Sequence, residues 1–179
     1  MNSVILRQFK EAAVQLCIQE LTVDPSRQLN MNSGDRAAAA ATCVFCRIIR
    51  GEIPAHRIYE DEAVLAFLDV GPVVTGHTLV VPKTHYQDIF EIPDQIIAGV
   101  SSRLPRLARA VAAATHVSAC HILVNNGREA MQSVPHLHYH IIPRQAGDGF
   151  NVPWHPGRLP GERAGELVAA IAGALRREA

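Results

Sequence analysis

The sequence predicts an α+β domain that is built on an antiparallel sheet. Short apolar segments rich in β-branched residues cluster between turn residues, which is typical of strands. Helical periodicity is confined to a few unevenly placed segments, so regular alternation of strand and helix in a parallel sheet is disfavoured. The 179 residues suffice for one domain with additional segments, and the 48% hydrophobic content excludes wholesale disorder.

Charge and composition narrow the class of protein further. The 17 basic and 17 acidic side chains cancel, so no strong field for nucleic acid or an anionic membrane is expected. No apolar run approaches the roughly 20 residues that span a bilayer, and charged residues interrupt the N-terminal apolar stretch too early for a secretory signal. Four cysteines are too few for a disulfide scaffold. We therefore expect a cytoplasmic protein without nucleic-acid or membrane partners.

Residues 1–42 are expected to form an N-terminal extension that is separate from the domain. Apolar residues at helical spacing predict a helix over 4–21. Small and polar residues over 30–42 predict a linker. Met31-Asn32-Ser33 repeats Met1-Asn2-Ser3, so Met31 is a second candidate for the start of translation.

The domain is expected over residues 43–150, and turn residues separate its predicted strands. Asp61-Glu62 lies between two β-prone segments and predicts a hairpin. Pro82 ends a β-branched run, and Asn126-Gly127 is a turn pair that follows another. The strands are predicted, in chain order, over 57–60, 63–69, 77–81, 121–125 and 134–142.

Three helical segments complete the prediction. Residues 45–50 form a helical turn that precedes the hairpin. A long central helix is expected over 93–116 and should be kinked or split at Pro105, because proline removes a helical hydrogen bond. The last residues, 151–179, are expected to form a loop and a C-terminal helix.

Three of the nine histidines occupy alternate positions in the last predicted strand of the domain. Successive side chains of a strand point to opposite faces, so His136, His138 and His140 share one face. The apolar residues between them take the other face, where a core is expected. A helix would align His136 with His140 but turn His138 away, and the prolines at 135 and 143 also favour a strand.

This row of imidazoles has three interpretations. One metal ion held by all three is disfavoured, because His136 and His140 are about 13 Å apart along a strand. A neutral imidazole can instead attack phosphorus, while its neighbours hold phosphoryl oxygens or move protons. Three solvated histidines without a role are the third interpretation. Polar residues that suit a phosphoester site are Asn125, Gln132, Ser133 and His77.

The sequence resembles the histidine triad (HIT) family, whose signature alternates three histidines with apolar residues. Residues 136–142 (HLHYHII) fit every position of that signature. Residues 43–86 and 125–144 resemble the two halves of the family's domain, so the likeness covers most of 43–150. It is closest to the Hint-like branch, and it implies the HIT-like fold and a homodimer.

The resemblance implies an enzyme that cleaves purine nucleotide conjugates at the α-phosphate. His138 would be the nucleophile, and water would release the nucleoside monophosphate from a nucleotidyl-histidine. The backbone carbonyl of His136 would fix the tautomer of His138. His140 and His77 would contact the phosphate, and Ser133 completes the implied catalytic set. A nucleoside phosphoramidate is the expected type of substrate.

The resemblance also implies where the nucleotide binds. Asp69 would hold the ribose hydroxyls with its carboxylate. The base would lie in an apolar slot formed by Phe45, Ile48 and Phe67. The phosphate and leaving group would be surrounded by Asn125, Gln132 and Ser133, together with His138 and His140.

Two alternative functions and two departures from the family pattern stay open. One alternative is a dinucleoside polyphosphate hydrolase or phosphorylase with the same nucleophile and another leaving group. The other is a nucleotide-binding regulatory or scaffold protein with vestigial catalysis. Met131 stands where the family commonly has small residues, and Pro105 lies in a helix that relatives keep continuous.

Cys43 and Cys46 form a C-x-x-C pair. In a reducing compartment such a pair favours metal or redox chemistry over a structural disulfide. A tetrahedral zinc site needs two more ligands, and the resemblance places them at His85 and His136. We expect a structural zinc ion and no organic cofactor. A dithiol redox pair and two buried small side chains are the alternatives.

Overall fold

The computed structural model describes residues 33–151 and 155–178, which divide into two compact units between Asp148 and Gly149. The predicted helix over 4–21 lies outside the described residues. The first unit contains α2 (Ser33–Thr42), α3 (Val44–Ile49), β1 (Arg57–Glu60), β2 (Val64–Leu68), β3 (Thr78–Pro82), α4 (Asp94–Thr115), β4 (Ala119–Val124), a 3-10 turn (Arg128–Ala130) and β5 (Tyr139–Arg144). The second contains α5 (Gly161–Glu178). None of the described helices is long and apolar enough to cross a membrane.

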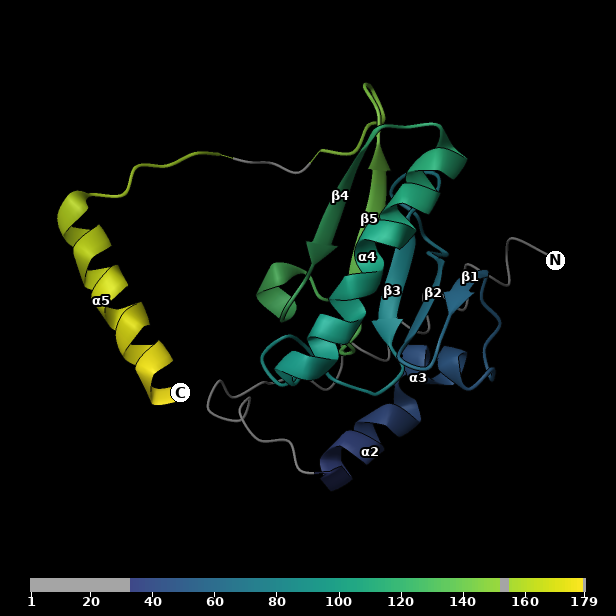
Figure 1. The fold of residues 1–179 in the computed structure, drawn as a ribbon, viewed down its shortest axis with the longest axis horizontal. Helices are drawn as coiled ribbons and strands as arrows, with labels where there is room; N and C mark the ends of the chain where they lie inside the picture. Colours follow the sequence, from purple (N-terminus) through teal and green to yellow (C-terminus); the bar gives the residue numbers. More distant parts are fainter. Residues whose placement is uncertain (1–32, 152–154, 179) are drawn as a thin grey trace. The chain divides into compact units, whose positions relative to one another are not determined.

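The five strands form one antiparallel sheet, which confirms the predicted fold class. Their order is β1-β2-β3-β5-β4, so β5 enters between β3 and β4. The long helix α4 connects β3 to β4 and lies across one face of the sheet (Figure 1). This topology places the histidine-bearing strand β5 inside the sheet, beside β3.

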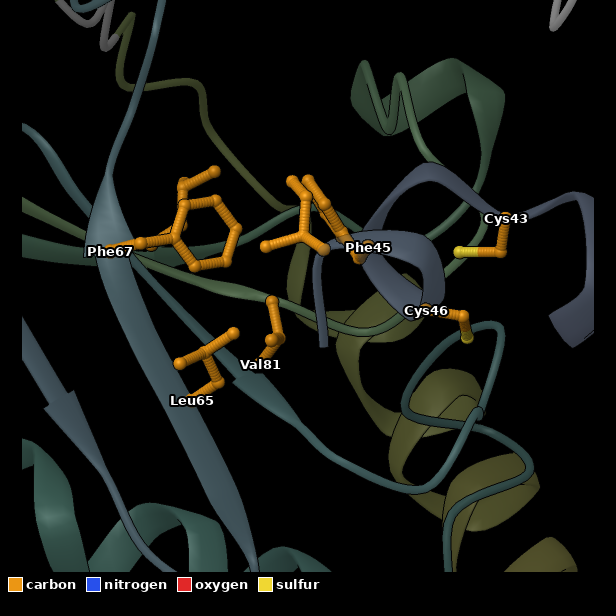
Figure 2. Close-up of a cluster of buried hydrophobic side chains, with 8 residues drawn as sticks. Cys43, Phe45, Cys46, Leu65, Phe67 and Val81 are labelled. Atoms are coloured by element: carbon orange, nitrogen blue, oxygen red, sulfur yellow. The ribbon is translucent and has the colours of Figure 1, made fainter. Parts of the chain in front are cut away.

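Alternation along the strands divides the core between the two faces of the sheet. The face that α4 covers is formed by Val64, Ala66, Val80, Tyr139 and Ile141, with Val100, Leu107 and Val111 from the helix. The opposite face is covered by α3 and is formed by Phe45, Ile48, Leu65, Phe67, Leu79 and Val81. Figure 2 shows Phe45 between the strand residue Phe67 and the two cysteines of the C-x-x-C pair. The cysteines are thus anchored at the edge of a packed core.

One predicted segment differs in the structure, and one of the two outcomes expected at Pro105 is excluded. Ser33–Thr42, predicted as linker, forms α2, because its alanines favour helix and Ala40 packs against the α3 side of the core. Arg36 of this helix also lies over the ring of Tyr86, 4.7 Å from its centroid. The central helix is not split at Pro105 but runs continuously through it. Burial of Leu107 and its neighbours against the sheet outweighs the local cost of proline.

The last strand of the sheet begins later than predicted. Its ladder starts at Tyr139 rather than 134, so His136 and His138 precede it. The backbone N–H of Leu137 donates to the carbonyl of Tyr86 (2.6 Å) instead of to a neighbouring strand. The segment before β5 is therefore held against the chain that follows β3.

Candidate active site and metal centre

The two cysteines and two of the histidines converge at one end of α3. Cys43 precedes this helix and Cys46 lies in it, whereas His85 follows β3 and His136 precedes β5. All four side chains are buried, and their ligand atoms lie within 4.8 Å of one another. Sγ of Cys43 lies 3.4 Å from Nδ1 of His136, and Sγ of Cys46 lies 3.3 Å from Nδ1 of His85. The structure thus brings together all four predicted metal ligands.

The chemistry of this donor set fits zinc. At the usual bond lengths, a tetrahedral zinc ion separates its sulfur and nitrogen ligands by roughly 3.5 Å, close to the distances seen here. Nε2 of His136 lies 2.9 Å from the carbonyl of Pro82, so that Nε2–H donates and the lone pair of Nδ1 faces the cysteines. A ligand histidine needs this kind of support to fix its tautomer. When bound, zinc would cross-link α3, the chain after β3 and the chain before β5.

The contact between the two thiols shifts their pKa values in opposite directions. A hydrogen bond from Cys46 lowers the pKa of the Cys43 thiol to about 2, and contacts with His136 and His85 add to this effect, although burial opposes it. The same bond and burial raise the pKa of Cys46. Of the two thiols, Cys43 is therefore the more acidic. A cation would promote loss of the thiol protons.

His138 is buried and oriented by its own segment. Its Nδ1 lies 2.6 Å from the carbonyl of His136, to which Nδ1–H donates. Burial lowers the pKa of His138, and this hydrogen bond opposes the effect. The ring is therefore neutral at pH 7, with a lone pair on Nε2. The rings of Phe45 and His138 pack edge to face, with their centroids 5.1 Å apart.

Asp69, His77 and His140 form a second polar cluster beside His138. Nε2 of His77 lies 2.9 Å from Nδ1 of His140, and Nδ1 of His77 lies 3.3 Å from Oδ2 of Asp69. Burial lowers the pKa of His140 to about 4, and the neighbouring His138 and His77 add to the shift. Burial also lowers the pKa of His77, against the opposing effect of the Asp69 carboxylate. Both ring nitrogens of His77 thus face protein groups, although a phosphate contact is predicted for this residue.

The residues predicted to hold the base lie together but are packed. Phe45 and Phe67 meet edge to face, with centroids 5.7 Å apart, in the same cluster as Ile48. Their exposed fractions are 6%, 3% and 7%, respectively. In this structure they present core surface rather than an open slot.

Two polar side chains of the predicted phosphate loop form hydrogen bonds to nearby backbone groups. Oε1 of Gln132 accepts the N–H of Gly127 (2.7 Å), and its Nε2 donates to the carbonyls of Gln87 (2.6 Å) and Val134 (3.1 Å). The amide of Asn125 donates to the carbonyl of Met131 (3.4 Å), whereas Ser133 is exposed. Gln132 therefore acts here as a link within the loop. No local pattern distinguishes this role from phosphate binding.

Asn126 is a residue of this loop that sequence reasoning treated only as part of a turn. Its Oδ1 accepts the backbone N–H of Ile89 (2.9 Å), which adds a second link to the chain after β3. Met131 adopts a left-handed conformation (φ 63°) and is 80% exposed. Its apolar side chain therefore faces solvent beside the loop.

Gly76 positions His77 by allowing close approach of α4. Its φ is +88°, and a Cβ there would lie 2.5 Å from Cγ2 of Thr115. We expect Gly76→Ala to lower the free energy of unfolding by about 2 kcal/mol and to lower any activity that depends on His77. Urea unfolding and turnover assays measure these effects. Gly147→Ala is the matched control, because Gly147 also has a positive φ (75°) but nothing within 4 Å of its Cβ; an equal cost in both variants would contradict the steric explanation.

A separate surface cavity of about 490 Å³ lies near the C-terminal end of α4. Its lining includes Thr75, His116 and Asp148 but none of the predicted site residues. This cavity therefore lies apart from the cluster of buried imidazoles.

Comparison with known proteins identifies related sequences. The model of the HIT domain matches residues 50–147. The chain is 47% identical to Protein hit from Bacillus subtilis over 116 residues, covering 64% of this chain and 80% of that protein. It is 42% identical to the adenylylsulfatase HINT3 from Arabidopsis thaliana over 121 residues, covering 65% of this chain and 61% of that protein. It is 36% identical to the adenosine 5'-monophosphoramidase HNT1 from Saccharomyces cerevisiae over 132 residues (73% and 81%).

Solved structures show the same fold. SMU.412c from Streptococcus mutans superposes with a TM-score of 0.73 at 35% identity, covering 87% of this chain and 94% of the other. A zinc-bound histidine triad family protein from Mycobacterium smegmatis superposes with a TM-score of 0.60 at 40% identity, covering 78% and 99%.

Proposed function

The chain belongs to the HIT family, and on that premise we propose that it hydrolyses purine nucleotide conjugates at the α-phosphate through a nucleotidyl-histidine on His138. The observation that carries the proposal is the orientation of this ring. Its Nδ1–H is bound to the carbonyl of His136, so the lone pair is on Nε2, and burial keeps the imidazole neutral. A neutral, oriented imidazole is a competent nucleophile at pH 7.

The reaction would proceed in two displacements at phosphorus. In the first, Nε2 of His138 bonds to the α-phosphorus and the bond to the leaving group breaks; the leaving group keeps that electron pair and takes up a proton from water. In the second, water cleaves the nucleotidyl-histidine. Asp69, which is 22% exposed, is the proposed ligand of the ribose hydroxyls. Ser133 and Asn125 are proposed contacts of the phosphate and leaving group.

The names of two relatives support adenylyl conjugates as the class of substrate. One is called an adenosine 5'-monophosphoramidase and the other an adenylylsulfatase. Both names describe release of a group from an adenylyl phosphate. We place nucleoside phosphoramidates first among candidate substrates of this chain.

Rapid quenching and intact mass measurement test this proposal. The enzyme is mixed with adenosine phosphoramidate, adenylyl sulfate or a dinucleoside polyphosphate and is quenched before the first turnover is complete. We expect an added mass of one adenylyl group, which disappears in His138→Asn. The conjugate that gives the fastest adduct reports the preferred leaving group. Nucleotide binding without any adduct would favour the regulatory or scaffold alternative.

We also propose a structural zinc ion at Cys43, Cys46, His85 and His136. The short distances between their ligand atoms and their burial support it, as does a zinc-bound relative. A shell of four protein ligands leaves no open position for substrate. The ion would thus stabilise the site without entering the reaction.

A homodimer is the proposed assembly. The strand β4 lies at one edge of the sheet, and Ile122 in this strand is 41% exposed. Edge strands are favourable places for pairing with a second chain. We expect analytical ultracentrifugation to give twice the mass of the chain, and Ile122→Lys to shift the equilibrium toward monomer. A monomer at micromolar concentration would contradict this assembly.

A further inference from the structure

The helix α2 carries one long side chain on the face that it turns toward the domain. Four residues at the helical spacing i, i+3, i+4 and i+7 share that face, namely Arg36, Ala39, Ala40 and Cys43. These four residues are buried or partly buried, whereas the other residues from 34 to 42 are exposed. Between Arg36 and Cys43 the face offers only the methyl groups of alanine. The docking of α2 therefore depends largely on Arg36.

The guanidinium group of Arg36 packs on an aromatic ring. Its carbon Cζ lies 4.7 Å from the centroid of the Tyr86 ring, and Tyr86 is only 6% exposed. Nε of Arg36 is buried and has no hydrogen-bond partner among the residues that the structure describes. A cation over the face of an aromatic ring is attracted by the negative π surface, and more strongly where water is excluded. The contact thus holds α2 to the chain that follows β3.

This contact spans the two segments that carry Cys43 and His85. Tyr86 follows His85 directly, and Cys43 is the first residue after α2. The backbone N–H of Cys43 donates to the carbonyl of Ala39 (3.1 Å), which continues the hydrogen bonds of α2. Its own carbonyl accepts the N–H of Arg47 (3.0 Å), which begins those of α3. The position of the Cys43 thiol therefore depends on where both helices lie.

The two helices are anchored unequally. Phe45 and Ile48 fix α3 in the core. Ala40 of α2 packs against the same core, and its carbonyl accepts a hydrogen bond from Nη1 of Arg50 (3.3 Å). Both of these contacts lie in the C-terminal half of α2. Arg36 is the anchor of the other half.

We propose that Arg36 is a positioning residue of the metal centre, which acts through Tyr86 to keep the Cys43 thiol beside His85. The proposal rests on the proposed zinc site, but it concerns a helix that precedes the residues 50–147 of the HIT-domain match. When the contact breaks, α2 and Cys43 move away together and the shell of ligands opens. The strength of the contact therefore sets how often the centre opens and how fast a bound ion leaves.

Arg36→Ala tests this proposal without weakening the helix itself, because alanine is the strongest helix former. Arg47→Ala is the matched control, since Arg47 lies on α3, is 47% exposed and pairs with Glu52 (3.2 Å). The full chain is prepared in zinc-loaded and metal-free forms. Alkylation of the metal-free form by iodoacetamide, followed by peptide mass spectrometry, gives the reaction rate of Cys43. Transfer of zinc from the loaded form to an excess of a chromogenic chelator gives the rate of release.

We expect Arg36→Ala to raise both rates roughly 3- to 30-fold, the factor that corresponds to loss of one partly desolvated cation–π contact. Arg47→Ala should leave both rates within about twofold of the wild type. Tyr86→Phe keeps the ring and should behave like the wild type, whereas Tyr86→Leu should reproduce the effect of Arg36→Ala. Combining Arg36→Ala with Tyr86→Leu should give no faster rates than the faster single variant, because both remove one interaction.

Hydrogen exchange separates a role at the metal centre from a general loss of stability. The strand β3 is buried in the middle of the sheet, so its amides report global opening. Their exchange in Arg36→Ala should stay within about twofold of the wild type. Exchange in β3 that accelerates as much as alkylation of Cys43 would overturn the proposal. So would unchanged rates in Arg36→Ala, or effects of Arg36→Ala and Tyr86→Leu that simply add.

Failure of the wild-type chain to retain zinc is a different result, since it would overturn the metal site itself. Alkylation of the metal-free form would still decide whether Arg36 positions Cys43.

Discussion

Replacement of His138 by asparagine is expected to lower kcat/KM for adenosine phosphoramidate by roughly 10⁴-fold or more. The substitution removes the lone pair that would bond to phosphorus. The asparagine amide can still donate to the carbonyl of His136, the partner of Nδ1–H in the wild-type ring (2.6 Å). Folding and nucleotide binding should therefore survive. Turnover assays and titration calorimetry measure the two properties separately.

The control for this substitution is His56→Asn, at an exposed histidine outside the cluster of imidazoles. It should leave kcat/KM unchanged. Turnover by His138→Asn within about tenfold of the wild-type rate would mean that another group is the nucleophile or that water attacks directly. Loss of nucleotide binding together with turnover would instead indicate damage to the pocket.

Replacement of Cys43 by serine is expected to abolish zinc binding and to lower the free energy of unfolding by several kcal/mol. The hydrogen bond from Cys46 lowers the pKa of the Cys43 thiol, which favours its thiolate form as a metal ligand. Its removal leaves Cys46 and two buried histidines without a common partner. Metal analysis of protein purified without added zinc, followed by urea unfolding, measures both effects.

Cys120→Ser is the matched control, since Cys120 lies in β4, outside the four-residue cluster. It should keep the wild-type zinc content and lose little stability. A wild-type zinc content below half an equivalent per chain would count against the metal site. In that case Cys43 and Cys46 would be a redox pair or simply buried side chains.

Local patterns predict those elements that local interactions determine. Turn residues and alternation predict the β1–β2 hairpin, and proline and helical periodicity predict α4 almost to its ends. The helix α2 is missed, because a run of alanines is also compatible with a linker until Arg36 is seen to pack on Tyr86. The start of β5 is misplaced because the backbone of Leu137 pairs with Tyr86, far away in the chain.

The candidate site likewise has parts that local patterns predict and parts that depend on residues far apart in the chain. The partner of His138 lies only two residues away and is accessible to local reasoning, whereas the predicted shared face assumed a strand that begins only at Tyr139. The pairing of the cysteines with His85 and His136 is implied by family resemblance, because ligands from three separate segments have no common local pattern. The line from Asp69 through His77 to His140 likewise depends on β3 and β5 being neighbours in the sheet.

The links made by Gln132 and Asn126 have a consequence for motion. They join the loop before β5 to Gln87 and Ile89, just beyond the proposed metal ligand His85. Neither stretch can open to solvent without breaking hydrogen bonds of the other, so the two should fluctuate as one cooperative unit. Loosening at the proposed zinc site would then also increase the mobility of the proposed phosphate loop.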